Sequence, residues 1–363
     1  MKIGAVKMSE LTKMLNEGYL AIDSGEFERA YDMFLKGTRI YNSNVQCVKG
    51  LALCDFYRGK YEEAIRRFNE VLKIQPHDFN VLSCYQKAYD LIQIDLLKKS
   101  ILTSEEKKLL ARCYKVKEQY ENAFKVLKEI SSTLSAEESL DLAKLTGKVF
   151  PEHFQLRKQY IEKAIKAYEK EGLNAYMPYH MLGRAYYDAY SVDELIEHGS
   201  DVIAIFEKSI ALNKDYGHNY YLVGSILKLN DQYEESLPYY DLAIEKTEGL
   251  RNNYLLGKIK SLYFTRRYHE CLETIFYLNK YDYQGGNFAE ALLYAGYCYY
   301  KLGEYHTAEE YAHRAAREDY DADEVEDLLD YISEGRKERE EKRREQREEK
   351  VGLFGRIFNR FKQ

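Results

Sequence analysis

Tryptophan is absent from this chain of 363 residues, and proline occurs only four times. Few prolines and few runs of Val and Thr leave little material for β-strands. No stretch approaches the roughly 18 apolar residues that a membrane-spanning helix needs, and the first ten residues lack a long apolar core. The sequence therefore predicts an all-α protein, which we expect in the cytoplasm.

Catalytic motifs are also missing. The chain has no Gly-x-Ser-x-Gly elbow, no phosphate loop ending in Gly-Lys-Ser/Thr, no His-Glu-x-x-His and no dinucleotide fingerprint. The histidines are scattered, and no further ligands follow His269, Glu270 and Cys271 at metal spacing. We therefore expect no enzyme, no metal site and no cofactor.

Cysteine and charge set two further limits. None of the six cysteines forms a Cys-x-x-Cys pair, so we expect small buried side chains in a reducing compartment. The formal net charge of -6 gives no general attraction to nucleic acid, so we expect no nucleic-acid partner. What the chain does have is 36 tyrosines, many of them at positions where two helices would meet.

A pattern in residues 59–76 returns along the chain. Gly59 ends one helix, Tyr61 packs in the turn, Ala64 permits close helix contact, Phe68 fills the core and Pro76 stops the helix. About 34 residues earlier the same frame consists of Gly25, Phe27, Ala30 and Phe34. Near the C-terminus it consists of Gly303, Tyr305, Ala308 and Ala312, after a first-helix frame of Leu292, Ala295, Gly296 and Tyr299.

This pattern resembles that of the tetratricopeptide repeat (TPR) family, in which a bulky aromatic, Leu-Gly and Tyr mark the first helix, and Ala, Phe and Pro mark the second. Tyr179, Leu182, Gly183 and Tyr186 fit the first half. The resemblance covers residues 10 to 320 and implies a right-handed α-solenoid of about eight helix-turn-helix units. The chain departs from the pattern in lacking tryptophan and in placing only Pro76 at the closing proline position.

We expect one continuous solenoid over residues 1–320. Its units are expected at roughly 11–44, 45–78, 104–137, 138–174, 176–216, 217–250, 252–286 and 288–320, with an irregular helix at 79–103. Ser9 is expected to cap the first helix, and Thr103 with Glu106 and Ser135 with Glu138 to form capping boxes. An insertion at 188–200 is expected to project from the turn inside its unit.

Residues 321–335 are expected to form a capping helix, because Val325, Leu328, Leu329 and Ile332 make a narrow apolar stripe among acidic faces. Gly335 is expected to break it or to act as a hinge. Residues 336–350 contain no apolar residue, which excludes a coiled-coil seam. A solvated helix or a charged linker remains, and either would be a spacer.

Residues 351–363 differ from the rest of the chain. As a helix they place Leu353, Phe354, Ile357, Phe358 and Phe361 on one face, with Arg356 and Arg360 around the rest. A basic amphipathic segment of this kind predicts weak contact with an anionic membrane surface. The alternatives are docking onto the protein's own groove, binding to a partner helix, or disorder.

The resemblance implies that first helices line a concave inner face. First-helix positions that do not pack on the second helix are predicted to bind a partner peptide that carries acidic groups, because aromatic rings and basic side chains suit such a ligand. These residues are His180, Arg184, Tyr187, His218, Tyr221, Lys228, Lys260, Tyr263, Tyr297, Tyr300 and Lys301.

The sequence thus predicts a scaffold or adaptor without catalytic activity that binds peptides or helices, tethered to a membrane surface by its tail. The alternative is a regulatory subunit or peptide sensor that gates an enzyme or transcription factor by a change of superhelical pitch.

Overall fold

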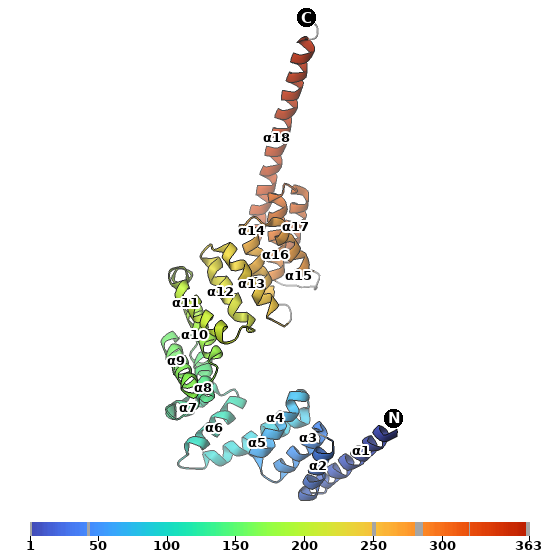
Figure 1. Ribbon diagram of the computed structural model, residues 1–363, viewed down its shortest axis with the longest axis vertical. Helices are drawn as coiled ribbons and strands as arrows, with labels where there is room; N and C mark the ends of the chain where they lie inside the picture. The colour runs from blue at the N-terminus through green and yellow to red at the C-terminus, as the bar shows by residue number, and fades with distance from the viewer. Residues whose placement is uncertain (1, 42–43, 249–251, 280–285, 319, 361–363) are drawn as a thin grey trace. The chain divides into compact units, whose positions relative to one another are not determined.

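The computed structural model describes residues 2–41, 44–248, 252–279, 286–318 and 320–360, with no side-chain description for residues 2–9, 279, 286–287 and 350–360. Over these residues the chain forms 18 helices and no strand, in the order shown in Figure 1. The all-α prediction is therefore confirmed. The chain divides into two compact units, residues 1–160 and 161–363.

Unit 1 consists of helices that pack on their neighbours in chain order. They are α1 (Lys2–Asp23), α2 (Phe27–Ile40), α3 (Val45–Tyr57), α4 (Tyr61–Ile74), α5 (Phe79–Leu97), α6 (Ser104–Val116), α7 (Tyr120–Glu129) and α8 (Ala136–Val149). Helix α9 (Phe154–Glu171) spans the boundary between the units. Helix α1 already begins at Lys2, so the prediction that Ser9 caps it was wrong.

Unit 2 continues in the same manner. Its helices are α10 (Tyr176–Ala189), α11 (Val192–Leu212), α12 (Gly217–Leu229), α13 (Tyr233–Glu245), α14 (Asn252–Phe264), α15 (Tyr268–Asn279), α16 (Gly286–Lys301), α17 (Tyr305–Arg317) and α18 (Ala322–Arg360). Each packs on the next from α10 onward, and α14 also contacts the first helices on either side of it, α12 and α16. This pattern is that of a solenoid, in which one helix of each unit contacts its equivalent in the next unit.

Six of the described turns inside units contain a residue with positive φ. Gly25, Gly59 and Gly303 have φ values of 78, 74 and 78°, as the repeated glycine predicts. Three turns without glycine use Glu118, Asp231 and Arg266 instead, with φ values of 58, 58 and 61°. The turn geometry is therefore kept in units where the sequence signal for it is lost.

The repeated Ala and Phe positions form the contact between helices. Ala30, Phe34, Ala64 and Phe68 are each fully buried. A β-carbon added at Gly50 would lie 2.5 Å from the Phe34 ring, so the first helix of the following unit can approach this ring only through glycine.

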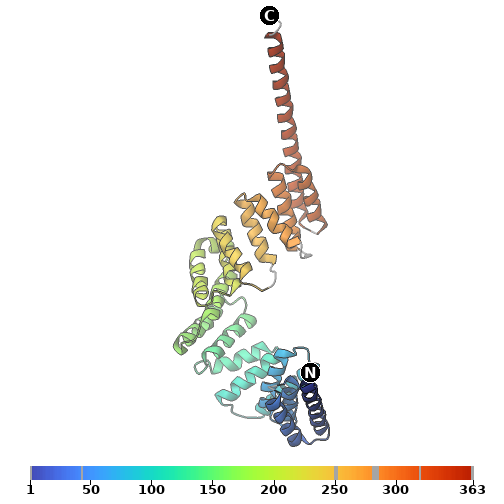
Figure 2. The same cartoon turned by 45° about the vertical axis from the view of Figure 1, so that its right-hand side comes forward.

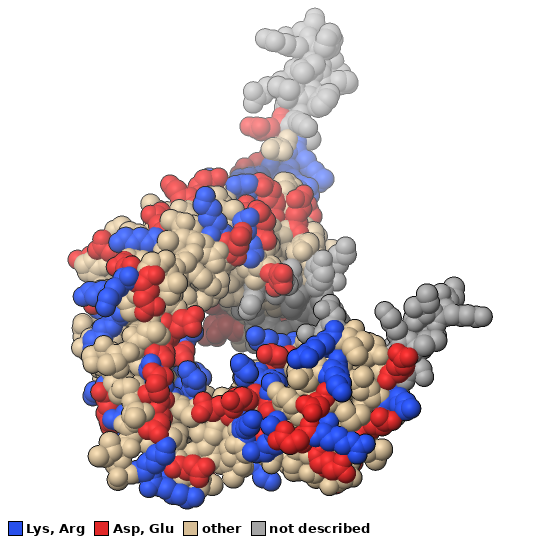
Figure 3. All heavy atoms as spheres, turned by 60° about the horizontal axis from the view of Figure 1, so that its bottom comes forward, with Lys and Arg blue, Asp and Glu red and all other residues tan. Residues whose placement is uncertain are grey.

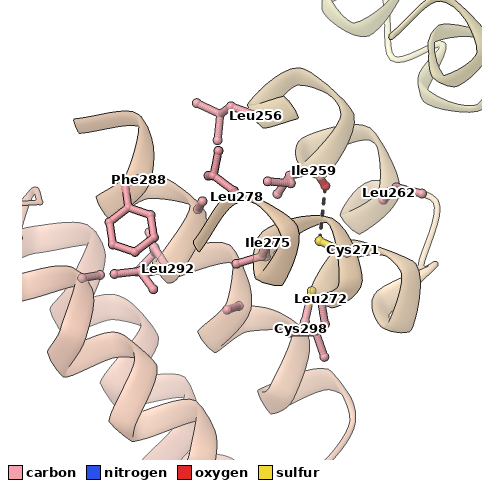
Figure 4. Packing of buried hydrophobic residues seen from close by; sticks show 14 of the residues in the cluster. Leu256, Ile259, Leu262, Cys271, Leu272, Ile275, Leu278, Phe288, Leu292 and Cys298 are labelled. Carbon is pink, nitrogen blue, oxygen red and sulfur yellow. Dashed lines mark hydrogen bonds between the residues drawn. The ribbon is translucent and has the colours of Figure 1, made fainter. Parts of the chain in front are cut away.

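The same arrangement fills the core of unit 2, where side chains of α14, α15 and α16 point toward one another (Figure 4). Ile259, Ile275 and Leu292 are almost completely buried there. The thiol of Cys271 donates a hydrogen bond of 3.4 Å to the carbonyl oxygen of Ile259 (Figure 4). All six cysteines are free thiols; Cys84 is half-buried and the others are buried.

Helix caps follow the sequence closely. Both predicted capping boxes, Thr103 with Glu106 and Ser135 with Glu138, are present. A third box, Ser191 with Glu194, begins α11 and was not predicted. The insertion expected as a projecting turn at 188–200 is therefore mostly helix, because this box starts α11 at Val192.

Helix α18 contains the predicted cap. Val325, Leu328 and Ile332 are buried in the core that α16 and α17 share with it. The expected hinge at Gly335 is not there: the helix continues through this residue, which packs against Tyr300 and Tyr305. Beyond it α18 extends as one long helix (Figure 2). The side chains of residues 337–349 are exposed.

Candidate functional site

The predicted binding residues lie on four first helices of unit 2, and we call their partly exposed side chains the first-helix face. His180, Arg184 and Tyr187 lie on α10, His218, Tyr221 and Lys228 on α12, Lys260 and Tyr263 on α14, and Tyr297, Tyr300 and Lys301 on α16.

His180 is mostly inside the protein, with 8% of its surface exposed. Its Nδ1 donates to Oδ1 of Asn219 at 2.8 Å, because a carbonyl oxygen can only accept. Asn219 Nδ2 then donates to Ser209 Oγ at 2.8 Å, and Ser209 donates to the Tyr176 carbonyl oxygen at 2.7 Å. Burial lowers the pKa of His180. This residue therefore joins α10, α11 and α12 and offers little surface to a partner.

His218 is the centre of an aromatic stack. Its ring lies 5.6 Å from Tyr221 and 6.1 Å from Tyr254, and the two tyrosine rings lie 4.5 Å apart, all within 26° of parallel. Nη1 of Arg184 lies 3.4 Å from Nε2 of His218, and Nδ1 of His218 lies 2.8 Å from the Tyr254 hydroxyl. Since arginine can only donate, Nε2 accepts and Nδ1 carries the proton.

Tyr254 was missed by the sequence analysis, although it is the partner that orients His218. It is 3% exposed and lies in α14, 36 residues after His218. Arg184 precedes His218 by 34 residues, so the three residues lie on successive first helices at spacings of about one repeat. That repeat spacing was the available signal.

Two of the predicted basic residues already have acidic partners. Arg184 Nε lies 2.6 Å from Asp188 Oδ1, and Lys260 Nζ lies 2.5 Å from Glu290 Oε1. The Lys260 pair connects α14 to α16 and is only 24% and 20% exposed. The first-helix face is therefore less positive than the sequence alone suggested.

Unit 1 uses the same kind of link between helices. Lys49 on α3 pairs with Asp78, the N-cap of α5, and Lys115 on α6 pairs with Asp141 on α8, each at 2.5 Å. On the face shown in Figure 3, Lys and Arg side chains are interspersed with Asp and Glu.

Lys228 and Lys301 differ from the paired lysines. Within the described part of the chain, the ammonium group of Lys228 has no ion-pair partner, although the side chain is half-buried. Burial lowers its pKa, and the neighbouring Lys260 lowers it further. Lys301 is exposed and lies over the ring of Tyr300 at 5.1 Å.

The remaining predicted residues form a tyrosine cluster. Tyr263 lies 5.8 Å from Tyr297 and 5.4 Å from Tyr294, measured between ring centroids. Tyr300 lies 6.3 Å from Tyr331 of α18. Tyr294 and Tyr331 were not predicted, although Tyr331 follows Tyr297 at the repeat spacing of about 34 residues.

The described residues meet neither the requirements of a metal site nor those of a membrane-spanning helix. No group of three or more His, Cys, Asp or Glu side chains among them is arranged to hold a metal ion. None of the described helices combines the length and the apolar character needed to cross a bilayer. The tail residues Leu353, Phe354, Arg356, Ile357, Phe358, Arg360 and Phe361 lie outside the described side chains.

No protein-family model matches the chain. A TPR repeat-containing protein of Methanocaldococcus jannaschii is 24% identical over 322 residues, which cover 84% of this chain and 51% of the relative. The chain thus spans about half the length of the curated relative that it matches.

The chain is also similar to several solved structures. YrrB, described as a TPR protein with an unusual peptide-binding site, is 20% identical, with 55% of this chain and 94% of YrrB covered and a TM-score of 0.45. The APC/C assembly Cut9–Hcn1 is 12% identical, with 85% and 59% covered and a TM-score of 0.44. MamA is 20% identical, with 56% and 91% covered and a TM-score of 0.32.

The helix pairs stacked in chain order define an α-solenoid, a class of proteins built from repeated units. The recurring frame of glycine, alanine and aromatic positions is similar to that of tetratricopeptide repeats, for which the curated relative is named. The resemblance drawn from the sequence is confirmed. Repeats of this family are in general protein-interaction modules without catalytic activity.

Proposed function

We propose that this chain is an adaptor without catalytic activity that binds a partner peptide or helix on the first-helix face of unit 2. The observation that carries the proposal is the aromatic stack of His218, Tyr221 and Tyr254, which Arg184 holds by hydrogen bonding. Tyr254 is buried and orders the stack, while the half-buried rings of His218 and Tyr221 offer contact area at a small cost in conformational entropy. Their order in the free protein means that little ordering remains to be done on binding.

The charge of Lys228 favours a partner that carries an acidic group. The ammonium group of Lys228 is half-buried, and the nearby carboxylate of Glu290 is already paired with Lys260, so a carboxylate from a bound peptide would stabilise the charge of Lys228. Arg184 and Lys260 would contribute less than the sequence suggested, because each would have to leave or share its present carboxylate.

The test is a selection of binding peptides from a random display library against the full chain, followed by affinity measurements on variants. We expect Lys228→Glu to weaken the selected peptides about tenfold. Lys166→Glu, on the exposed side of α9, is the matched charge control and should leave affinity within about twofold. Equal loss with both variants would overturn the proposal.

We also propose that residues 351–363 attach the protein weakly to an anionic membrane surface. The support is their sequence, which combines a row of large apolar residues with basic ones. The exposed helical residues 337–349 would hold unit 2 about 20 Å from the surface, at 1.5 Å per residue.

Co-sedimentation with phosphatidylserine vesicles tests the tail. Binding should fall with added salt and disappear with Phe354→Glu and Phe358→Glu together. Unchanged binding of this variant, or no binding of the intact chain at low salt, would exclude the membrane role.

The alternative function, a sensor that regulates an enzyme or transcription factor, predicts an additional effect. Peptide binding would change the solution scattering profile of the full chain, whereas an adaptor would bind with the profile unchanged.

A further inference from the structure

The C-terminal end of the first-helix face differs in charge from the α10–α14 end. Between residues 321 and 334 the chain has no Lys or Arg, and it has seven acidic residues: Asp321, Asp323, Glu324, Glu326, Asp327, Asp330 and Glu334. Glu324, Asp327 and Tyr331 share one side of α18, because helical residues three and four positions apart are neighbours. Val325, Leu328 and Ile332 occupy the core side instead.

This side of α18 lies against α16, because the ring of Tyr331 is 6.3 Å from the ring of Tyr300 and the two helices pack together. Burial raises the pKa of Tyr297, and the nearby carboxylates of Glu324 and Asp327 raise it further. Glu324 accepts a hydrogen bond of 3.1 Å from the Tyr320 hydroxyl. Among the described side chains, neither Glu324 nor Asp327 has a Lys or Arg as an ion-pair partner.

Tyrosine rings on this part of the protein already hold cations. Lys260 lies over Tyr294 at 6.0 Å, Lys301 over Tyr300 at 5.1 Å, and Arg339 over Tyr305 at 5.7 Å. An ammonium or guanidinium group within about 6 Å of a ring centroid is attracted by the negative face of the ring. The chain's own side chains therefore show that these rings accept cations at this distance.

Two rings beside them have no such cation. No described Lys or Arg lies over Tyr297 or Tyr331, and Tyr331 is 50% exposed. Tyr331 shares one side of α18 with Glu324 and Asp327, and Tyr297 lies on α16, which packs against α18. A carboxylate next to a ring stabilises a cation placed on that ring, so the two effects act on the same ligand group.

We infer that Tyr297 and Tyr331, together with Glu324 and Asp327, bind a basic segment of the partner, with an Arg or Lys side chain over the tyrosine rings. This inference rests on the proposed function, since it concerns the same face, and it adds the chemistry of the partner's second half. A partner that lies along the whole face would carry acidic groups toward Lys228 and basic groups toward α18. Its direction of binding would be fixed by this difference in charge.

The experiment uses the full chain and a fluorescein-labelled peptide with three arginines separated by Gly-Ser spacers. The same peptide with citrulline in place of arginine keeps the shape without the charge. Fluorescence anisotropy should show binding of the arginine peptide and at least tenfold weaker binding of the citrulline peptide. Binding should decrease with added salt.

Matched variants separate a site from the general charge of α18. Glu324→Gln with Asp327→Asn should weaken the arginine peptide about fivefold. Glu326→Gln with Asp330→Asn removes the same charge from another side of α18 and should leave affinity within about twofold. Tyr331→Leu keeps an apolar side chain but loses the ring face, and should weaken binding about threefold.

Equal weakening by both acidic double variants, or no effect of Tyr331→Leu, would overturn the inference, because net charge would then account for the binding. The proposed function is tested separately by Lys228→Glu on peptides from the display library. If those peptides lose affinity while arginine-peptide binding ignores Glu324 and Asp327, this inference fails and the proposed function stands. If Lys228→Glu has no effect while the arginine peptide responds as expected, the proposed function fails and the site for a basic segment stands.

Discussion

Lys260 and Glu290 form an ion pair of 2.5 Å between α14 and α16, two successive first helices. The pair is mostly shielded from solvent and lies beside Lys228, whose pKa it influences through both of its charges. It therefore contributes to the contact between repeats and also controls how much positive charge the first-helix face offers.

Glu290→Gln separates these two contributions. Loss of a partly exposed ion pair should cost about 1 kcal/mol in the free energy of unfolding. The released Lys260 should raise the affinity for acidic peptides about threefold, because its charge becomes available. Asp241→Asn breaks the Lys258–Asp241 pair of 2.6 Å and is the control; it should change stability similarly but leave peptide affinity unchanged. Weaker peptide binding by Glu290→Gln would contradict this role.

The buried His180 should make stability depend on pH. Its pKa lies below the ordinary value of 6.5 in the folded protein, mainly because burial disfavours the charged ring, and Arg184 adds to this effect. The unfolded chain therefore binds a proton first as the pH falls, so this contribution to stability is present above pH 6.5 and is lost below it.

Thermal unfolding between pH 8 and pH 5 measures this effect. His180→Gln should flatten the decrease in melting temperature below pH 6.5, whereas His306→Gln, which changes an exposed histidine, should not. An unchanged pH profile of the His180 variant would show that another group is responsible.

Gly257 tests the close approach of α13 and α14. A β-carbon at this position would lie 2.3 Å from the ring of Tyr240, which is fully buried. Gly257→Ala should therefore destabilise unit 2 by about 1–3 kcal/mol through overpacking. A β-carbon added at Gly147 of α8 would lie no closer than 3.9 Å to the atoms packed around it. Gly147→Ala should therefore stabilise its helix by about 0.5–1 kcal/mol. Urea unfolding compares the two, and a neutral Gly257→Ala would contradict the packing described for this contact.

The cap of α18 should act locally. Leu328 is fully buried against the last repeat, so Leu328→Ala should cost about 2–5 kcal/mol. In a repeat protein this loss should be confined to neighbouring helices, here α16 and α17, when amide hydrogen exchange is followed. An equal loss of protection in α1 to α4 would show that stability is not a sum of neighbouring contacts.

The features predicted correctly from the sequence are those set by a few adjacent residues. Gly59 ends its helix because its φ of 74° suits glycine, and Thr103 and Glu106 cap α6 across one turn. The helix α11 was misjudged at its start because the same kind of box at Ser191 and Glu194 was overlooked. The hinge expected at Gly335 is absent, since tertiary contacts with Tyr300 and Tyr305 favour a continuous helix there.

The site was harder to predict because most of its contacts, other than the Arg184–Asp188 pair within α10, join side chains from different repeats. Arg184 and Lys260 were assigned as basic residues of the face, but Asp188 and Glu290 neutralise them. Tyr254 was missed because its link to His218 needs the register between α12 and α14, which differs by two residues from that between α10 and α12. His180 fits the same periodicity as the other predicted residues, but its side chain is buried and hydrogen-bonded to Asn219.

The central claim is that the first-helix face of unit 2 binds a partner peptide. Hydrogen exchange of the full chain with and without a peptide selected from a random display library tests it most directly. The account predicts slower exchange in α10, α12, α14 and α16, because their outward side chains would be covered and their helices held more firmly. Protection confined to the second helices α11, α13, α15 and α17, with no change in the first helices, would contradict it.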